Sequence, residues 1–146
     1  MTENPTSSSA DTLRSVTLDR VTTGTYVART ARGGSVTMSS TDDAHLSPIE
    51  LLLAAIAGCT AVDVDTVTSR RAEPDALTVT VTAHKVHDGT GTVLRDVELT
   101  LSLRLPDDAP EGVREVAERA LRVSHDRTCT VSRTVEAGTP VSVRMA

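Results

Sequence analysis

Two cysteines, Cys59 and Cys129, are the side chains in this 146-residue sequence best suited to redox chemistry. Cys59 ends the apolar stretch SPIELLLAAIAGC, whereas Cys129 lies in the polar stretch SHDRTCTVSR with Arg127 and Arg133 nearby. A partly exposed thiol beside cations can ionise to a thiolate, or it can resolve an oxidised partner. Each cysteine could instead be inert, Cys59 as a small buried hydrophobe and Cys129 as an incidental surface thiol. In a reducing compartment, the pair favours reactive or buried thiols over a structural disulfide.

The stretch before Cys59 has the signature of a helix start. Ser47 can cap the first free amides, Pro48 fits the first helical position, and Glu50 can bond back to the Ser47 amide. From Leu51 to Val64 the residues are apolar on nearly every face, so we expect a helix buried on all sides. A single chain of this size encloses such a helix with difficulty, and we therefore predict a homodimer. Cys59 lies too far from the cap for the helix start to stabilise its thiolate, so a reactive Cys59 needs a cation from elsewhere.

The remaining elements follow from alternation, helical spacing and turn residues. Residues 77–86 and 97–105 alternate apolar and polar side chains around a turn, which predicts a β-hairpin. The other predicted elements are two or three antiparallel strands over 15–21 and 25–40, an amphipathic helix over about 110–124, a short element over 129–135 and a final strand over 140–145. This order predicts an α+β fold with a largely antiparallel sheet.

Composition limits the classes of partner and compartment. The net charge of −5 with interspersed signs, and a single aromatic residue in Tyr26, argue against nucleic acid as a partner. The first residues lack the pattern of a signal peptide, and no apolar run approaches the roughly 20 residues that span a bilayer, so we expect a cytoplasmic protein without a membrane partner. We expect residues 1–12 to form a disordered leader and residues 13–146 a single domain.

The two cysteine motifs together resemble those of a known family. SPIELLLAAIAGCTAVDV, followed about 70 residues later by CTVSRTV, resembles the OsmC/Ohr family of small thiol-dependent peroxidases, and the resemblance extends from about Ser15 onward. It implies antiparallel sheets wrapped around a long buried central helix, an intertwined homodimer, and an active site at the subunit interface. It also implies that Cys59 attacks the terminal oxygen of an organic hydroperoxide and becomes a sulfenic acid. Cys129 would then form a disulfide with Cys59, which an external dithiol reduces in oxidative-stress defence.

The family implies two further site residues, a glutamate and an arginine, and this sequence displaces both. The family's glutamate follows the proline directly, where this chain has Ile49, and Glu50 comes one residue later. On a straight helix Glu50 lies nearly opposite Cys59, so Glu50 is a candidate catalytic residue whose only role could be the cap.

For the arginine, Arg29 and Arg32 are the nearest candidates, since residues 36–46 contain none. We favour Arg32 because Gly33 and Gly34 would let the loop approach another group closely. Either arginine could also be a solvated strand residue. Asp63 follows Cys59 by one helical turn and would disfavour the Cys59 thiolate unless it is paired with an arginine.

Two other functional classes stay open from the residues alone. A non-catalytic dimer could keep the fold and bind a small apolar or thiol-bearing ligand at its interface, which the displaced glutamate and arginine favour. A metal site is disfavoured, because His84 and His87 are three residues apart on a predicted strand and point to opposite faces. We expect neither a metal nor an organic cofactor, and the sequence has no nucleotide-binding loop or Ser-His-Asp signature.

Overall fold

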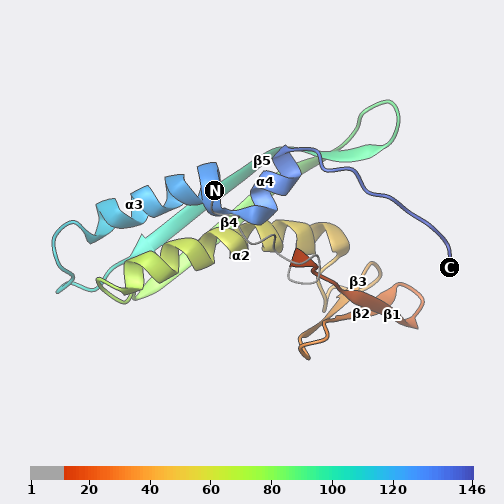
Figure 1. The fold of residues 1–146 in the computed structure, drawn as a ribbon, viewed down its shortest axis with the longest axis horizontal. Helices are drawn as coiled ribbons and strands as arrows, with labels where there is room; N and C mark the ends of the chain where they lie inside the picture. Colours follow the sequence, from red (N-terminus) through yellow and green to blue (C-terminus); the bar gives the residue numbers. More distant parts are fainter. Residues whose placement is uncertain (1–11) are drawn as a thin grey trace, which may run out of the picture. The chain divides into compact units, whose positions relative to one another are not determined.

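The computed structural model describes residues 12–146, so the predicted leader over residues 1–12 lies almost wholly outside the described residues. The chain divides into two compact units, residues 1–51 and 52–146, and the boundary falls within the first turn of helix α2 (Pro48–Ser69). Each unit has its own antiparallel sheet (Figure 1). Together with the long helix, these sheets confirm the predicted α+β class; the prediction of a single domain over residues 13–146 stays a prediction.

The first unit holds a three-stranded sheet with the order β1-β2-β3. Its strands are β1 (Thr17–Thr22), β2 (Thr25–Arg29) and β3 (Ser35–Ser39), which confirms the predicted antiparallel strands. Gly24 makes the tight turn between β1 and β2 with a positive φ of 78°, and a Cβ there would lie 2.5 Å from Cγ2 of Thr41. The turn therefore requires glycine for both its backbone conformation and its space.

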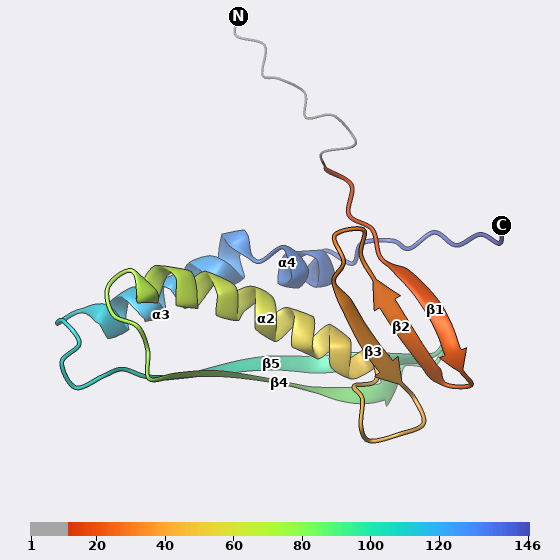
Figure 2. The same ribbon diagram turned by 90° about the horizontal axis from the view of Figure 1, so that it is seen from below.

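The second unit is built on the predicted hairpin of β4 (Ala76–His87) and β5 (Thr92–Arg104), which pair antiparallel with an irregularity between Thr82 and His84. The apolar residues of β4 are half-buried and its threonines are exposed, as the alternation predicts. Figures 1 and 2 show the second-unit part of α2 and helix α3 lying along the same face of this hairpin. The hairpin thus supplies one wall for the helix that carries Cys59.

Two helices and one π-helical turn follow the hairpin. Helix α3 (Val113–Val123) confirms the predicted amphipathic helix and runs directly into η1 (Ser124–Thr128), a single π-helical turn. The predicted short element is helix α4 (Thr130–Glu136), which Cys129 caps. The predicted final strand is wrong: residues 140–145 form no strand, and Val141, Val143 and Met145 are almost fully exposed. An extended segment needs a neighbouring strand for its backbone hydrogen bonds, and none within residues 12–146 pairs with it.

Helix α2 is less buried than its sequence predicts. Only Ile56, Thr60, Val64 and Thr68 are buried, which is one stripe at four-residue spacing rather than every face. The reason is that the hairpin and α3 lie on one side of the helix, and within one chain its other apolar side chains stay partly or fully exposed. By length and composition, α2 could also cross a membrane, which differs from the expectation that no apolar run is long enough. The core helix of a soluble protein meets the same two criteria, so they do not by themselves indicate a membrane span.

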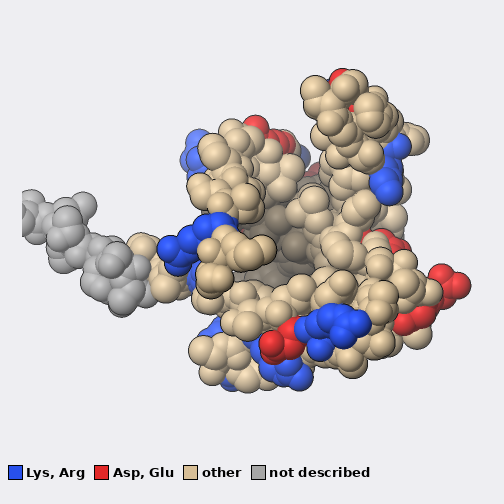
Figure 3. Space-filling view, turned by 90° about the vertical axis from the view of Figure 1, so that its right-hand side faces the viewer, with Lys and Arg blue, Asp and Glu red and all other residues tan. Residues whose placement is uncertain are grey.

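The exposed surface mixes charged and uncharged residues. On the face drawn in Figure 3, Lys, Arg, Asp and Glu are dispersed among uncharged residues, and the basic groups form no continuous patch. The exposed residues of the described chain include large hydrophobic ones such as Leu52 and Val62 on α2. The described chain therefore has apolar surface left for contacts.

Candidate functional site

The second unit brings the two predicted cysteines together. Cys59 lies in the middle of α2, and Cys129 lies at the break between η1 and α4. Each thiol shifts the pKa of the other, which places the two close together, and both cysteines are free. Thr60, the neighbour of Cys59, places its hydroxyl 4.0 Å from Sγ of Cys129. Two thiols in this arrangement can exchange between a dithiol and a disulfide.

Cys59 has an environment that favours the neutral thiol. Its side chain is half-buried, and burial is the largest cause that raises the pKa of this thiol above its ordinary value. The backbone N–H of Val131 opposes the shift, while Cys129 and the negative charge of Asp63 add to it. None of these groups is positively charged. The predicted need of Cys59 for a cation is therefore not met by the groups that shift its pKa in the described chain.

The surroundings of Cys129 lower its pKa and so favour the thiolate, although Cys129 is more deeply buried than Cys59. Its relative exposure is 0%, so the prediction of a partly exposed thiol is wrong. Burial by itself would raise the pKa of Cys129, but hydrogen bonds with the hydroxyl and the N–H of Ser132, together with Cys59 and Thr60, lower it below the ordinary value. Sγ lies 3.3 Å from the Ser132 hydroxyl and accepts the Ser132 N–H at 3.4 Å.

The arginines beside Cys129 in the sequence are not among the largest causes of this shift. The guanidinium of Arg133 donates to the backbone oxygen of Arg127 at 3.2 Å. The causes that lower the pKa of Cys129 are hydrogen bonds from uncharged groups. The sequence pattern thus indicated an acidic thiol for the wrong reason, because it could not show which groups the fold turns toward the sulfur.

Asp63 is paired with two hydroxyl groups rather than with an arginine. Its Oδ2 accepts a hydrogen bond from Oγ of Ser124 at 2.7 Å and one from Oγ1 of Thr128 at 2.9 Å. Ser124 and Thr128 are the first and last residues of η1. The sequence could not reveal these contacts, because the partners are separated by more than 60 residues and hydroxyl residues are common.

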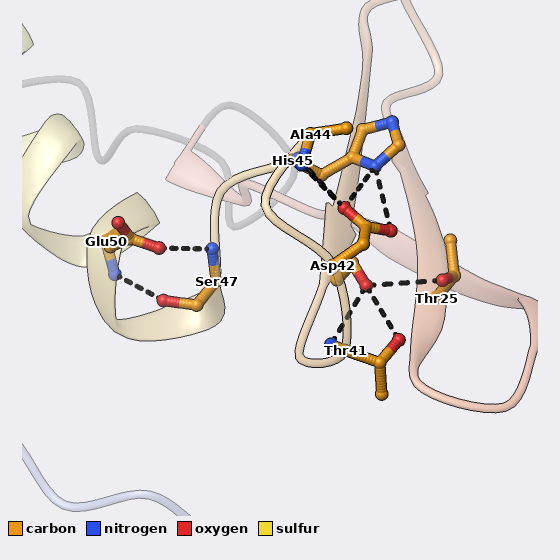
Figure 4. Close-up of polar contacts among 8 residues, drawn as sticks. Thr25, Thr41, Asp42, Ala44, His45, Ser47 and Glu50 are labelled. Carbon is orange, nitrogen blue, oxygen red and sulfur yellow. Dashed lines mark hydrogen bonds and ion pairs between the residues drawn. The ribbon is translucent and has the colours of Figure 1, made fainter.

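Glu50 forms the predicted cap at the start of α2. The Ser47 N–H donates to Oε1 of Glu50 at 2.9 Å, and the Glu50 N–H donates to Oγ of Ser47 at 3.2 Å (Figure 4). These hydrogen bonds lower the pKa of the Glu50 carboxyl below its ordinary value. Glu50 belongs to the first unit, and the capping box accounts for its contacts in the structure; its catalytic role stays a prediction.

Arg32 lies in the first unit, exposed in the tight turn between β2 and β3. Gly33 has a φ of 98°, and no atom lies within 4 Å of a Cβ built on it. This φ gives Gly33 a backbone role in the turn, and a Cβ on Gly34 would lie 3.3 Å from Oγ1 of Thr30; the close approach of this loop to another group stays a prediction. Arg29 forms an exposed ion pair with Asp19 at 3.2 Å. A contact between Arg32 and Cys59 stays a prediction.

A pocket of about 350 Å³ lies beside the thiols in the second unit, and the sequence analysis did not locate it. Its polar wall includes Thr60 and Ser132, the two residues whose hydroxyls contact Sγ of Cys129. Its apolar lining comes from four separate elements and consists of Ile56, Val97, Leu99, Leu121 and Val135. Because α2, β5, α3 and α4 each contribute, no local sequence pattern could have identified it. The pocket has the size and lining to accept a small, largely apolar molecule.

Comparisons with known proteins agree with this fold. The chain is 31% identical over 132 residues to uncharacterised proteins of Mycobacterium bovis and Mycobacterium tuberculosis, covering 88% of this chain and 93% of theirs. A hypothetical protein from Aquifex aeolicus has a similar structure, with a TM-score of 0.68 and 21% identity, covering 87% of this chain and 89% of that one. An OsmC-like protein from Mycoplasma pneumoniae gives a TM-score of 0.66 and 16% identity, covering 86% and 89%.

The family model of the OsmC-like proteins matches residues 40–144. The matched range contains helix α2, both cysteines and every residue that lines the pocket beside them. The resemblance seen in the cysteine motifs is therefore confirmed, and this chain belongs to the OsmC-like protein family.

Proposed function

We propose that this protein is a cysteine-based peroxidase that reduces organic hydroperoxides with an external dithiol, in defence against oxidative stress. The observation that supports the proposal most directly is the interaction of Cys59 with Cys129 across about 70 residues of sequence. Two free thiols close to one another, beside a largely apolar pocket, suit an oxidation that ends in a disulfide.

The proposed reaction has three steps. The Cys59 thiolate attacks the terminal oxygen of the hydroperoxide, the O–O bond breaks, and the alkoxide leaves and takes a proton to become an alcohol. The Cys129 thiolate then attacks the sulfur of the Cys59 sulfenic acid, and the departing hydroxide takes a proton to become water. Finally the external dithiol reduces the Cys59–Cys129 disulfide and is itself oxidised to a disulfide.

The first step needs a positive charge near Cys59, because burial and Asp63 favour its neutral thiol. We propose Arg32 for this role, with Glu50 as a carboxylate that orients the arginine and the peroxide. The alkyl group of the substrate would lie against the apolar lining of the pocket, which includes Ile56 and Leu121. This assignment keeps Cys59, Cys129, Arg32 and Glu50 as the proposed catalytic residues.

We also propose that the active form is a homodimer in the cytoplasm. Leu52, Val62 and Val67 on α2 are exposed in the single chain, and a second copy that covers them would complete the burial predicted for this helix. A reducing compartment would keep both cysteines available as thiols between turnovers. Neither nucleic acid nor a membrane is part of the proposed function.

Turnover of cumene hydroperoxide and hydrogen peroxide with dithiothreitol tests the proposal in the wild type, Cys59→Ser and Cys129→Ser. These are the only cysteines of the chain, so the two variants account for every thiol. We expect faster turnover of cumene hydroperoxide, no turnover by Cys59→Ser, and a Cys59–Cys129 disulfide in wild type when the dithiol is omitted. Absence of turnover, with Cys59 unreactive toward both peroxides, would contradict the proposal.

A second candidate is a non-catalytic dimer that binds a small apolar or thiol-bearing ligand. Two observations favour it: the pKa of Cys59 is raised, and Glu50 is already engaged in the helix cap. The same assay separates the candidates, because a binding protein would show no turnover in any variant.

A further inference from the structure

Asp63 has no part in the proposed chemistry and works against its first step. Its negative charge contributes to raising the pKa of Cys59, one helical turn earlier on α2. A neutral side chain at this position would favour the Cys59 thiolate more. The two hydrogen bonds of the Asp63 carboxylate indicate what it does instead.

Both hydrogen bonds go to η1, the turn that precedes Cys129. The carboxylate accepts from Ser124 at 2.7 Å and from Thr128 at 2.9 Å, so it holds the two ends of this turn. The Cys129 N–H in turn donates to the Ser124 backbone oxygen at 2.8 Å. Asp63 therefore holds the backbone segment that sets where the Cys129 sulfur lies.

The π-helical turn η1 needs hydrogen bonds from other elements to hold its conformation. A π-helical turn is a rare conformation that occurs as single turns, frequently at functional sites. Hydrogen bonds from hydroxyls to a carboxylate are stronger than those between neutral groups. Ser124 is only 1% exposed, so water cannot readily replace the contact with Asp63. Asp63 and Thr60 lie on neighbouring turns of α2, and Thr60 contacts Cys129 Sγ directly, so one helix face holds both η1 and the sulfur.

We propose that Asp63 is the positioning residue for disulfide formation: by clamping η1 it places the Cys129 sulfur for attack on the oxidised sulfur of Cys59. The inference rests on the proposed function for its peroxide chemistry. In the step that Asp63 serves, the Cys129 sulfur forms the S–S bond, the S–O bond of the Cys59 sulfenic acid breaks, and hydroxide leaves and is protonated to water.

Separate measurement of the two oxidation steps tests this role. In Asp63→Asn we expect sulfenic acid to form on Cys59 at least as fast as in wild type, and the disulfide to form about 10- to 100-fold more slowly, since small misplacements of reacting groups have effects of this size. Sulfenic acid that a cyclic diketone traps should therefore accumulate in this variant and not in wild type. A merely structural role would slow both steps together and would not split them.

Asp65→Asn is the matched control. Asp65 lies on the same helix, is exposed, and accepts a hydrogen bond from Ser69 at 3.0 Å, so it carries the same charge without touching η1. We expect wild-type rates for both steps in this variant. If Asp63→Asn does not fold, Thr128→Val removes one of the two clamping hydrogen bonds at an exposed position, and it should slow only disulfide formation.

Oxidation with diamide, which needs no peroxide chemistry, separates this inference from the proposed function. If wild type gives no sulfenic acid with peroxide, yet diamide forms the disulfide faster in wild type than in Asp63→Asn, the peroxidase proposal fails and the positioning role stands. Equal rates of disulfide formation in the two proteins would overturn the positioning role. A wild type that forms no intramolecular disulfide with diamide would overturn it as well.

Discussion

Cys59 and Cys129 lie close enough to shift each other's pKa, yet their surroundings shift the two pKa values in opposite directions. Cys59 sits inside a continuous helix, where burial, a second thiol and the carboxylate of Asp63 raise its pKa. Cys129 is more buried, but it lies at a break in the backbone, where the free N–H and the hydroxyl of Ser132 lower its pKa. Burial alone therefore does not decide the acidity of a thiol. For Cys129 the hydrogen bonds with the Ser132 hydroxyl and N–H outweigh burial, whereas for Cys59 the single backbone hydrogen bond from Val131 does not.

This difference fits a division of labour between the two thiols. Within α2 the backbone N–H groups are committed to the helix, so the backbone donor to Cys59 comes from Val131 in another element. Cys129 has donors supplied by its own chain segment and can form a thiolate at lower pH. In the proposed reaction Cys129 is the resolving thiol, and its lowered pKa would favour the thiolate that attacks the sulfenic acid, whereas Cys59 would need a positive charge nearby.

Removing each thiol in turn should give the largest loss of peroxide turnover and the clearest difference between the two cysteines. Cys59→Ser should lower peroxide turnover by at least about 1,000-fold, since the nucleophile is lost. Cys129→Ser should lose efficient turnover with the dithiol but still undergo one round of oxidation at Cys59. Stopped-flow measurement of peroxide consumption at equimolar protein resolves the two cases. Full single-round oxidation of Cys59→Ser would contradict the assignment.

Ser132→Ala should weaken the contrast between the thiols. The variant loses the hydroxyl at 3.3 Å from Cys129 Sγ and keeps the N–H, which raises the pKa of Cys129 toward its ordinary value. A hydrogen bond to a charged group contributes about 1.5 kcal/mol, so disulfide formation near neutral pH should slow by about tenfold. Ser102→Ala, at an exposed position on β5, is the control. An unchanged rate in Ser132→Ala would show that its hydroxyl does not stabilise the thiolate.

The pH dependence of thiolate absorbance should show two separate steps. Because the pKa of Cys129 is lowered and that of Cys59 is raised, the first step on raising the pH should belong to Cys129 and the second to Cys59. Cys129→Ser should remove the earlier step. Its remaining step should move to lower pH, because Cys129 itself contributes to raising the pKa of Cys59. Loss of the later step in Cys129→Ser would reverse the assignment.

Replacing the two buried threonines of α2 should change the free energy of unfolding by a smaller amount, and by different amounts at the two positions. Thr60 contacts Cys129 Sγ, whereas Oγ1 of Thr68 is buried without a hydrogen-bond partner in the part of the chain that the structure describes. Thr68→Val removes this unpaired hydroxyl at nearly constant volume and should raise the free energy of unfolding by about 1 kcal/mol. Thr60→Val should give no such gain. Chemical denaturation of both variants checks the difference, and equal changes would contradict it.

Local features of the sequence were sufficient to predict most helices and strands, but not the contacts within the candidate site. Alternation predicted the hairpin of β4 and β5, and Ser47 with Glu50 predicted the start of α2, because both signals lie within a few residues. The full burial of Cys129 and the pairing of Asp63 depend on side chains more than 60 residues away, which leave no local pattern. Polar neighbours of Cys129 suggested a surface thiol, whereas the fold buries Cys129 completely.

The errors outside the site have a related cause. The alternating residues from 140 to 145 fit a strand, but alternation does not say whether a partner strand is available. The apolar faces of α2 predicted complete burial, and a single chain provides neighbours for only one stripe of it. Both patterns describe what a segment can bury or pair with, and neither shows whether a partner for it is available.

Peptide mapping by mass spectrometry after one equivalent of cumene hydroperoxide, without reductant, tests the division of labour most directly. Wild type, Cys59→Ser and Cys129→Ser would be treated in parallel, with a cyclic diketone present to trap sulfenic acid. We predict a Cys59–Cys129 disulfide in wild type and a trapped sulfenic acid on Cys59 in Cys129→Ser. Trapped sulfenic acid on Cys129 of Cys59→Ser, with Cys59 of Cys129→Ser still a free thiol, would contradict the account.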